Sequence, residues 1–460
     1  MTDSSEGGCV VLVGAGPGDP ELMTLRGAKA LARADVILYD ELATEELLDL
    51  APEHARRINV GKRGHEEPTR TQAEINALLV EEARSGNRVV RLKGGDPMVF
   101  GRGGEEASAC AEAGVPFQIV PGVSSAIAAA SYAGIPVTDR RHAASFAVVT
   151  GHKDPSAAAE ATRWSDLARS VDTLVVLMGM RNLRGIVSEI LDGGLDPETP
   201  AAAIMEGSLP TQRTCVSTLA GLADAVSQAE LAAPTAIVIG HVVELRQGLS
   251  WWEQQPLFGR KVLVTRAREQ AGEISSALRA VGADPALWPM IELVPTQDPE
   301  SLRQIDSAIA NLDAYDALVF TSSNAVRFFA AARTRFGGGT ASNPAGPQVF
   351  CVGEKTAAAA IHAKLPVHRV ASGRSDAEAL LAQLRIMLPN ESAPGRPARV
   401  LIPRSRIGRT VIADGLAASG ATVDSIPVRL REALPIKRVC PTCCPVQRTN
   451  REGRQTVWPE

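Results

Sequence analysis

Two glycine-rich segments, each directly after a short apolar run, carry the residue types best suited to ligand binding. The first segment is Gly14-Ala15-Gly16-Pro17-Gly18-Asp19-Pro20, at the end of Val10–Gly14. The second is Lys93-Gly94-Gly95-Asp96-Pro97, which follows Arg88–Leu92. Glycine lets the backbone adopt positive φ and approach a ligand closely. Because ligands bind at the carboxyl ends of strands in open α/β sheets, we expect the two turns to converge on one crevice.

The first segment does not complete a dinucleotide-binding fingerprint. The pattern G-x-G-x-x-G needs a third glycine where this chain has Asp19, and Pro17 lacks the backbone donor that a pyrophosphate would use. A nicotinamide-dependent oxidoreductase is therefore kept only as an alternative. Taken alone, the first segment is also consistent with a tight turn. The second is consistent with a strand-to-helix turn in which Glu105 and Glu106 stabilise a helix N-terminus.

Alternating strand-like and helix-like segments must position these turns. Strand composition occurs at Val10–Gly14, Val36–Tyr39 and Arg88–Leu92, and helical composition or spacing at Leu25–Ala34 and Gln72–Arg84. The alternation predicts α/β layers around a mainly parallel sheet. A second α/β region is expected after Pro121-Gly122, with strands at Phe146–Thr150, Thr173–Leu177, Ala201–Ile204 and Thr235–Ile239.

Composition excludes several classes of function. A chain of 460 residues predicts roughly three domains, and a net charge of −4 gives no basic field for nucleic acid. The N-terminus MTDSSEGG does not resemble a signal peptide, and no apolar stretch approaches the roughly 18 residues of a membrane helix. Four cysteines are scattered singly, which favours a reducing cytoplasm. They are Cys9, Cys110, Cys215 and Cys351.

The second half of the chain repeats itself once, at an offset of 138 residues from Val262 to Val400. The matches are Val262–Arg266 with Val400–Arg404, Leu278 with Leu416, Gly282-Ala283 with Gly420-Ala421, and Pro289 with Pro427. Each copy predicts a strand, a helix, a Gly-Ala turn and a strand, so the repeat indicates two related half-domains. The first copy continues to Tyr315–Val326, whereas residues 429–460 lack strand or helix period, and we expect the second copy to be cut short.

A set of motifs in the first half occurs together and in a characteristic order. They are Val13–Pro20, Val60–Arg63, Val90–Pro97, Phe100–Glu106, Val120–Ser125, Gly134–Thr138 and Thr150–His152. On these residues the chain resembles, across roughly residues 9–250, the uroporphyrinogen-III C-methyltransferases of the tetrapyrrole methylase family. The resemblance implies two α/β domains, residues 9–120 and 121–250, with S-adenosyl-L-methionine bound in the cleft between them.

The resemblance also implies which residues form the site. The expected cofactor-binding residues are Pro17, Gly94, Gly95, Asp96, Val99, Ser124, Ser125, Met178 and Gly207. Asp40 would be the proton acceptor and Lys62 the proton donor, although without the resemblance they would be a turn aspartate and a solvated lysine. One departure is Glu41, where the family commonly has arginine. The carboxylates of the substrate would need a locally basic cleft. Candidates for it are Arg26, Lys62, Arg63, Arg91, Arg102, Arg140 and Arg141.

The implied activity is methylation of uroporphyrinogen III to precorrin-2 by two methyl transfers, in sirohaem or cobalamin biosynthesis. A methylase of a later corrinoid intermediate is the alternative. The resemblance further implies a cytoplasmic homodimer that binds neither nucleic acid nor membrane. No metal is expected. Cys440, Cys443 and Cys444 lack a fourth ligand nearby, and structural zinc sites are tetrahedral.

Residues 251–260 are expected to be a linker, and 261–428 resemble uroporphyrinogen-III synthase. The residues that carry this second resemblance are Val262–Arg266, Val319–Val326, Cys351–Ala357 and Val400–Arg404. A fusion of consecutive steps is chemically sensible, because the synthase product is the methyltransferase substrate. Since the repeat looks incomplete and 429–460 is expected to be an irregular tail, we expect synthase activity to be absent or very weak. Alternatively, the second half is a docking module that delivers substrate.

Overall fold

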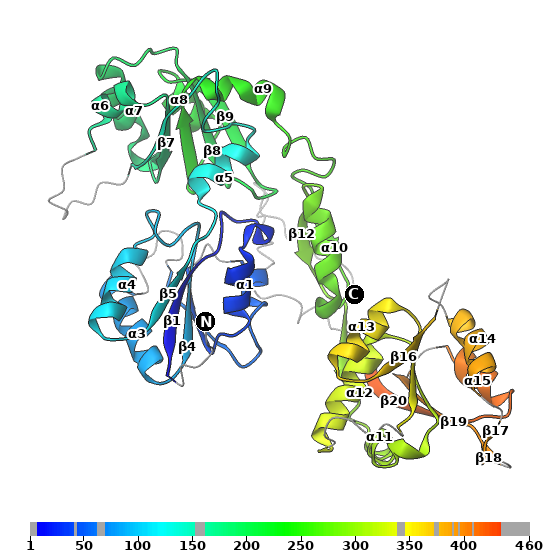
Figure 1. Ribbon diagram of the computed structural model, residues 1–460. Coiled ribbons are helices and arrows are strands. Elements are labelled where there is room, and N and C mark those ends of the chain that lie inside the picture. Colours follow the sequence, from blue (N-terminus) through cyan, green and yellow to red (C-terminus); the bar gives the residue numbers. More distant parts are fainter. Residues whose placement is uncertain are drawn as a thin grey trace, which may run out of the picture. The chain divides into compact units, whose positions relative to one another are not determined.

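The computed structural model describes residues 7–40, 44–61, 70–151, 162–337, 346–371, 377–388, 391–393, 396–406 and 409–433. The chain divides into two compact units, shown in Figure 1. The first unit is Met1–Val262 with Ser275–Ala286, and the second is Leu263–Ile274 with Leu287–Glu460. Within the described ranges, no helix combines the length and apolarity that crossing a membrane requires.

The first lobe of the first unit is a five-stranded parallel sheet with the order β3-β2-β4-β1-β5 (Figure 1). Its strands are β1 (Cys9–Gly14), β2 (Val36–Tyr39), β3 (Arg56–Asn59), β4 (Arg88–Lys93) and β5 (Phe117–Val120). Its helices are α1 (Leu25–Leu31), α2 (Glu45–Leu48), α3 (Gln72–Arg84) and α4 (Gly103–Glu112). The helices α3 and α4 pack on one face of the sheet and α1 and α2 on the other. The predicted parallel sheet is confirmed for this lobe.

The sequence explains these elements locally. Strand β1 is buried on both faces, as central strands of a parallel sheet must be, and Val10–Val13 are at most 1% exposed. Helix α3 begins at a capping box, in which the Thr71 hydroxyl accepts from the Glu74 amide and the Glu74 carboxylate accepts from the Thr71 amide. The register pairs Gly14 with Lys93, so both glycine-rich segments leave the sheet at the same edge.

The second lobe has a mixed five-stranded sheet with the order β6-β7-β10-β8-β9. The strands are β6 (Phe146–Thr150), β7 (Thr173–Leu177), β8 (Pro200–Met205), β9 (Arg213–Thr218) and β10 (Thr235–Ile239). The helices are α5 (Ser125–Tyr132), α6 (Trp164–Ser170), α7 (Leu183–Asp192), α8 (Leu222–Gln228) and α9 (Arg246–Leu249). Only β6 and β7 pair in parallel, since β10 runs antiparallel to both β7 and β8, and β8 to β9. Helix α5 covers one face, and α6, α7 and α8 cover the other.

The start of the predicted linker, residues 251–260, is instead part of the second lobe. Trp252 is 4% exposed, and its indole donates to the Leu209 carbonyl at 3.0 Å. The Trp251 indole donates to the Ser131 carbonyl at 3.1 Å, and both indole rings contact Tyr132. The prediction is therefore corrected for these two tryptophans, because indole hydrogen bonds and ring contacts attach both to the second lobe, although Trp251 is 45% exposed.

The second unit contains a six-stranded sheet with the order β13-β20-β19-β14-β15-β16. The strands are β13 (Ile291–Pro295), β14 (Ala317–Phe320), β15 (Gln348–Cys351), β16 (Val367–Val370), β19 (Arg399–Ser405) and β20 (Thr422–Ala433), with a small separate pair β17 (Glu391–Ala393) and β18 (Arg396–Pro397). The helices are α11 (Pro299–Ala310), α12 (Ser323–Arg335), α13 (Glu354–His362), α14 (Ala377–Met387) and α15 (Val411–Ala417). The first three helices pack on one face, and α14 and α15 on the other.

Strand β20 continues past the predicted end of this region. Its residues 429–433 pair antiparallel with β13, from Arg429 opposite Pro295 to Ala433 opposite Ile291. The expectation of an irregular tail from residue 429 is therefore wrong for its first five residues, because a partner strand supplies the hydrogen bonds that local sequence period does not reveal. Residues 434–460, including Cys440, Cys443 and Cys444, lie outside the described residues.

The two copies of the internal repeat have the same local structure. The first is β11 (Lys261–Val264), α10 (Arg268–Ala280) and β12 (Asp284–Leu287), and the second is β19, α15 and the start of β20. The Asp284 amide donates to the Arg260 carbonyl at 2.8 Å. The pair 138 residues later, Thr422 and Ala398, makes the same bond at 2.8 Å. Both Gly-Ala turns place their glycine at positive φ. Among the described residues, β11 and β12 form a sheet of two strands only, whereas β19 and β20 belong to the six-stranded sheet.

Candidate active site

The two glycine-rich turns meet at the carboxyl edge of the first sheet. The Gly16 amide donates to the Gly95 carbonyl at 3.2 Å, and the Gly95 amide donates to the Gly16 carbonyl at 2.7 Å. Gly16 has φ of 82° and Gly95 has φ of 65°, values that residues with a Cβ rarely adopt. The predicted convergence of the turns is confirmed.

A third segment, at the end of β5, locks the two turns together. A Cβ on Gly122 would lie 2.2 Å from the Gly95 carbonyl oxygen and 2.7 Å from the Gly14 Cα. Asp96 stabilises the same junction. Its Oδ2 accepts from the Gly122 amide at 2.9 Å, and its Oδ1 accepts from the Met98 amide at 2.8 Å. Both carboxylate oxygens of Asp96 therefore organise the loop.

A cavity of about 600 Å³ lies beside these turns, between the two lobes of the first unit. This volume is within the range of small-ligand sites. The lining residues are Gly16, Pro17, Gly94, Gly95, Asp96, Val99, Phe100, Gly101, Ser124, Ser125, Ala129, Leu177, Met178, Met180, Arg181, Ile204, Glu206, Gly207 and 233–236. All nine residues expected to bind the cofactor line this one cavity, although they come from positions 17 to 207 of the chain.

Several lining residues escaped the sequence reasoning. Phe100, Arg181 and Glu206 sit next to, or within three residues of, expected positions, so widening each motif would have found them. Residues 233–236 had no such signal, because nothing in their sequence distinguishes them from an ordinary strand start. They reach the cavity through the antiparallel pairing of β10 with β8.

Unusual backbone conformations cluster around the cavity. Seven non-glycine residues within the described ranges have positive φ. Three of them, Phe100, Met178 and Glu206, line the cavity with φ between 51° and 55°. Two more, Arg102 and Ser208, directly follow lining residues. Such conformations cost free energy and concentrate at functional sites, which supports a binding role for this cavity.

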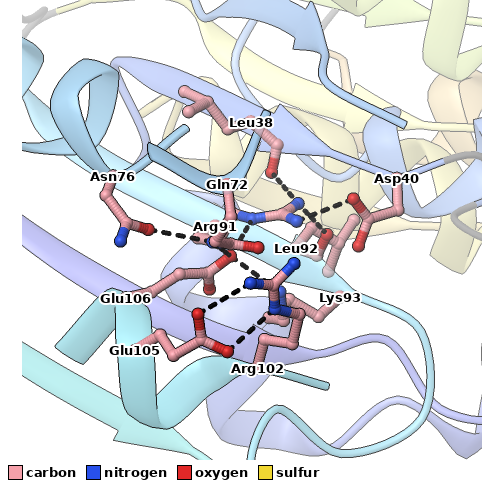
Figure 2. A network of polar contacts seen from close by, with 10 residues as sticks. All are labelled: Leu38, Asp40, Gln72, Asn76, Arg91, Leu92, Lys93, Arg102, Glu105 and Glu106. Carbon is pink, nitrogen blue, oxygen red and sulfur yellow. Dashed lines mark hydrogen bonds and ion pairs between the residues drawn. The ribbon is translucent and has the colours of Figure 1, made fainter. Parts of the chain in front are cut away.

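The expected proton acceptor Asp40 follows β2 and joins a buried network of charges (Figure 2). Its Oδ1 accepts from Arg91 Nη2 at 2.7 Å. The Oε1 atom of Glu106, on α4, accepts from Arg91 Nε at 3.1 Å and from Lys93 Nζ at 2.8 Å. The side chains of Arg91, Lys93 and Glu106 are almost fully buried, whereas that of Asp40 is 29% exposed. Burial, and then the charge of Arg91, lower the pKa of Lys93.

Several other residues expected at the site lie outside the described residues or are buried. Lys62, Glu41 and Arg63 lie outside the described residues, and so does His152. Arg91 was a candidate for binding substrate carboxylates, but it is 2% exposed and bound to Asp40 and Glu106, so it is not available at a surface. Among the described residues, no group of histidine, cysteine, aspartate and glutamate side chains could hold a metal ion.

Comparison with known proteins gives the family. Residues 9–223 match the model of the tetrapyrrole (corrin/porphyrin) methylases. The chain belongs to the tetrapyrrole methylases. Residues 272–429 match the model of uroporphyrinogen-III synthase HemD, so a synthase-like region is fused to the methylase.

The chain is similar to several individual proteins. The chain is 44% identical over 327 residues to a uroporphyrinogen-III C-methyltransferase of Bacillus subtilis, covering 70% of this chain and 66% of that protein. It is 40% identical over 324 residues to a porphyrin biosynthesis protein HemD of Ruminiclostridium josui, covering 70% of this chain and 63% of that protein. A solved structure of a Thermus thermophilus uroporphyrin-III C-methyltransferase complexed with S-adenosyl homocysteine is 42% identical. The match covers 52% of this chain and all of that one, with a TM-score of 0.45.

The chain spans 63% and 66% of the lengths of these two curated relatives, which is less than two thirds. Within it, the cavity and the charge network occupy the same edge of the first sheet, at the ends of β1, β2 and β4. The cavity lies against the turns after β1 and β4, and Asp40 follows β2. This arrangement places a small-ligand cavity and a partly exposed carboxylate at the same edge of the sheet, although Asp40 does not itself line the cavity.

Proposed function

We propose that the methylase transfers methyl groups from S-adenosyl-L-methionine to carbon atoms of uroporphyrinogen III, giving precorrin-2 by two transfers. The observation that carries the proposal is the single cavity lined by all nine expected cofactor positions. The family match and the 44% identity to a uroporphyrinogen-III C-methyltransferase support the choice of reaction.

The cavity fits the cofactor chemically. Its first-lobe wall includes the glycine turns, whose backbone groups can hydrogen-bond polar groups of a ligand, and most of its second-lobe lining residues are apolar, which suits a purine ring. S-adenosyl-L-methionine supplies a methyl group on a sulfonium, and the acceptor is a pyrrole carbon that needs no metal. Both Arg181 and Glu206 add charged side chains to the second-lobe wall.

Residues of the chain would then accept and donate protons. After a methyl group joins the ring, the macrocycle must lose a proton, and a positioned carboxylate is a suitable base. In this proposal Asp40 accepts the proton and Lys62 donates one. The partial exposure of Asp40, in contrast to the buried rest of its network, supports its role.

The direct test is incubation of the purified protein with uroporphyrinogen III and methyl-labelled S-adenosyl-L-methionine. We expect label in the macrocycle, with two methyl groups per molecule at completion. Asp40→Asn should retain cofactor binding by calorimetry but lose most turnover. Label that never enters the ring would reject the substrate. Efficient methylation of a later corrinoid and none of uroporphyrinogen III would favour the alternative, which the fused synthase-like region makes less attractive.

For the synthase-like region we propose weak or no conversion of hydroxymethylbilane to the type III isomer. The second copy of the internal repeat contributes β19 and β20 to a six-stranded sheet. The first copy has only the two-stranded sheet of β11 and β12 among the described residues. Two-stranded sheets are marginally stable by themselves. Formation of the type III isomer by the purified protein at a rate comparable to methyl transfer would reject this proposal. Methyl transfer after deletion of residues 260–460 would show that the region is not needed for docking substrate.

We also propose a cytoplasmic homodimer. The four described cysteines, Cys9, Cys110, Cys215 and Cys351, are free thiols, which suits a reducing compartment. Sedimentation equilibrium should give twice the chain mass of 48.4 kDa. A monomer at micromolar concentration would reject the dimer, and fractionation into a membrane or exported pool would reject the location.

A further inference from the structure

The four charged side chains Asp40, Arg91, Lys93 and Glu106, here called the β4 charge network, connect three elements of the first lobe (Figure 2). Arg91 and Lys93 lie two residues apart on β4, so both point to the same face of the sheet. Glu106 reaches them from α4, and Asp40 lies at the end of β2. Two cations and two carboxylates make the network formally neutral.

The network is not arranged to satisfy Glu106 as fully as possible. Arg91 Nε, Lys93 Nζ and, at 3.3 Å, Gln72 Nε2 all donate to its Oε1 atom. The other oxygen, Oε2, is buried and has no hydrogen-bond partner among the described residues. Buried polar atoms without partners are costly and uncommon, so the arrangement calls for an explanation other than stability.

The guanidinium of Arg91 is held on every side. Its Nη1 donates to the Leu92 carbonyl at 3.2 Å and to the Leu38 carbonyl at 3.4 Å, while its Nε donates to Glu106. These contacts fix the plane of the group, and because the guanidinium is a rigid fork, they also fix where Nη2 points. That direction is toward Asp40 Oδ1, at 2.7 Å.

Asp40 is the member of the network that reaches solvent. Its side chain is 29% exposed, against 3% for Arg91, 5% for Lys93 and none for Glu106. One oxygen is engaged by Arg91, and Oδ2 makes no hydrogen bond with the described residues. A carboxylate with one oxygen anchored and the other open is oriented to accept a proton from a bound molecule.

We propose that Arg91 is a positioning residue for methyl transfer, which holds the Asp40 carboxylate in the orientation for proton acceptance, and that Glu106 and Lys93 exist to fix and balance Arg91. The inference rests on the proposed function. The proposal gives a reason for burying three of the four charges, because the buried part of the network fixes Arg91 while Asp40 stays partly exposed.

The test is Arg91→Lys, which keeps the positive charge but loses the planar fork. We expect turnover to fall about 100-fold, as for a catalytic group displaced by about 1 Å, while the KM for S-adenosyl-L-methionine and the calorimetric affinity for S-adenosylhomocysteine change less than about threefold. In an Asp40→Asn background the same substitution should cost less than about threefold, because Arg91 then has no carboxylate to position. Arg57→Lys is the matched control, since Arg57 pairs with Asp49 at 3.2 Å at an exposed position on β3.

Three results would overturn the inference. They are unchanged turnover in Arg91→Lys, an equal loss in the Asp40→Asn background, and a loss of S-adenosylhomocysteine affinity parallel to the loss of turnover. If Arg91→Lys does not fold, Glu106→Asp keeps the charge but shortens the side chain that fixes Arg91, and the same criteria apply to it with an expected loss of about tenfold. Failure of the proposed function is distinguishable, because the wild-type protein would then transfer no methyl group.

Discussion

The two lobes of the first unit line one cavity with different kinds of residue. The first lobe contributes the glycine turns at Gly16–Pro17 and Gly94–Asp96, here called the backbone wall, which are joined by backbone hydrogen bonds. The second lobe contributes many apolar residues, such as Leu177, Met178 and Ile204, here called the side-chain wall. Two glycines of the backbone wall adopt positive φ, which residues with a Cβ rarely adopt, whereas an apolar side chain of the side-chain wall can be shortened with a graded effect. Substitutions in the two lobes should therefore differ in size and in kind.

The largest effect is expected for Gly122→Ala, because Gly122 packs against the glycine turns of the backbone wall. The new Cβ would lie 2.2 Å from the Gly95 carbonyl, so the bridge between the glycine turns must open. We expect the free energy of S-adenosylhomocysteine binding to weaken by about 3 kcal/mol, which is roughly a 100-fold loss of affinity and can be measured by calorimetry. Gly185→Ala, where a Cβ meets nothing within 4 Å, is the control. Equal affinity in both variants would remove the distinction between the walls.

Asp96→Asn tests the same wall without adding bulk. The amide nitrogen of asparagine cannot accept from a backbone N–H, so either Met98 or Gly122 loses its acceptor. We expect the free energy of cofactor binding to weaken by about 2 kcal/mol, a loss of affinity of roughly 30-fold, because a donor is left unpaired in a partly buried turn. A change of less than threefold would mean that Asp96 does not organise the loop.

Met178→Ala tests the side-chain wall. Met178 is 51% exposed in this structure, and a bound ligand in the cavity would cover part of it. Loss of that apolar contact should cost about 1 kcal/mol, or roughly fivefold in affinity. Turnover at saturating cofactor should stay unchanged. An effect as large as that of Gly122→Ala would show that both walls respond alike.

Tyr132→Phe alters a contact between the two lobes and should have the smallest effect on cofactor affinity, because Tyr132 does not line the cavity. The Tyr132 hydroxyl donates to Asp19 Oδ2 at 3.1 Å, so its removal should cost about 1 kcal/mol of unfolding free energy at pH 9. Burial, and then the Asp19 carboxylate, raise the pKa of Tyr132, so the folded state keeps a proton that the unfolded state releases above about pH 10. Stability contributed by this tyrosine is thus complete below pH 10 and lost as pH rises.

The measurement is urea unfolding followed by tryptophan emission, since the rings of Trp251 and Trp252 lie 5.1 and 5.2 Å from that of Tyr132. The difference between wild type and Tyr132→Phe should shrink between pH 9 and pH 11. A difference that grows over this range would contradict the sign of the pKa shift.

Much of the fold was predictable because local signals were strong. The ends of α3 and of β6, β7 and β10 agree with the sequence expectation, since apolar runs bounded by turns leave little ambiguity. Strand β9 was missed because it is partly exposed and polar. Residues 429–433 were missed for another reason, because their strand character comes from pairing with β13.

The sequence by itself determined the elements, the repeat and the positions of the glycine turns, because each depends on contacts between near neighbours in the chain. Only the tertiary structure decided that Arg91 is a buried partner of Asp40 rather than a surface ligand for carboxylates, and that residues 233–236 reach the cavity. Both outcomes depend on which distant strands pair, and residue type alone does not specify a partner far along the chain.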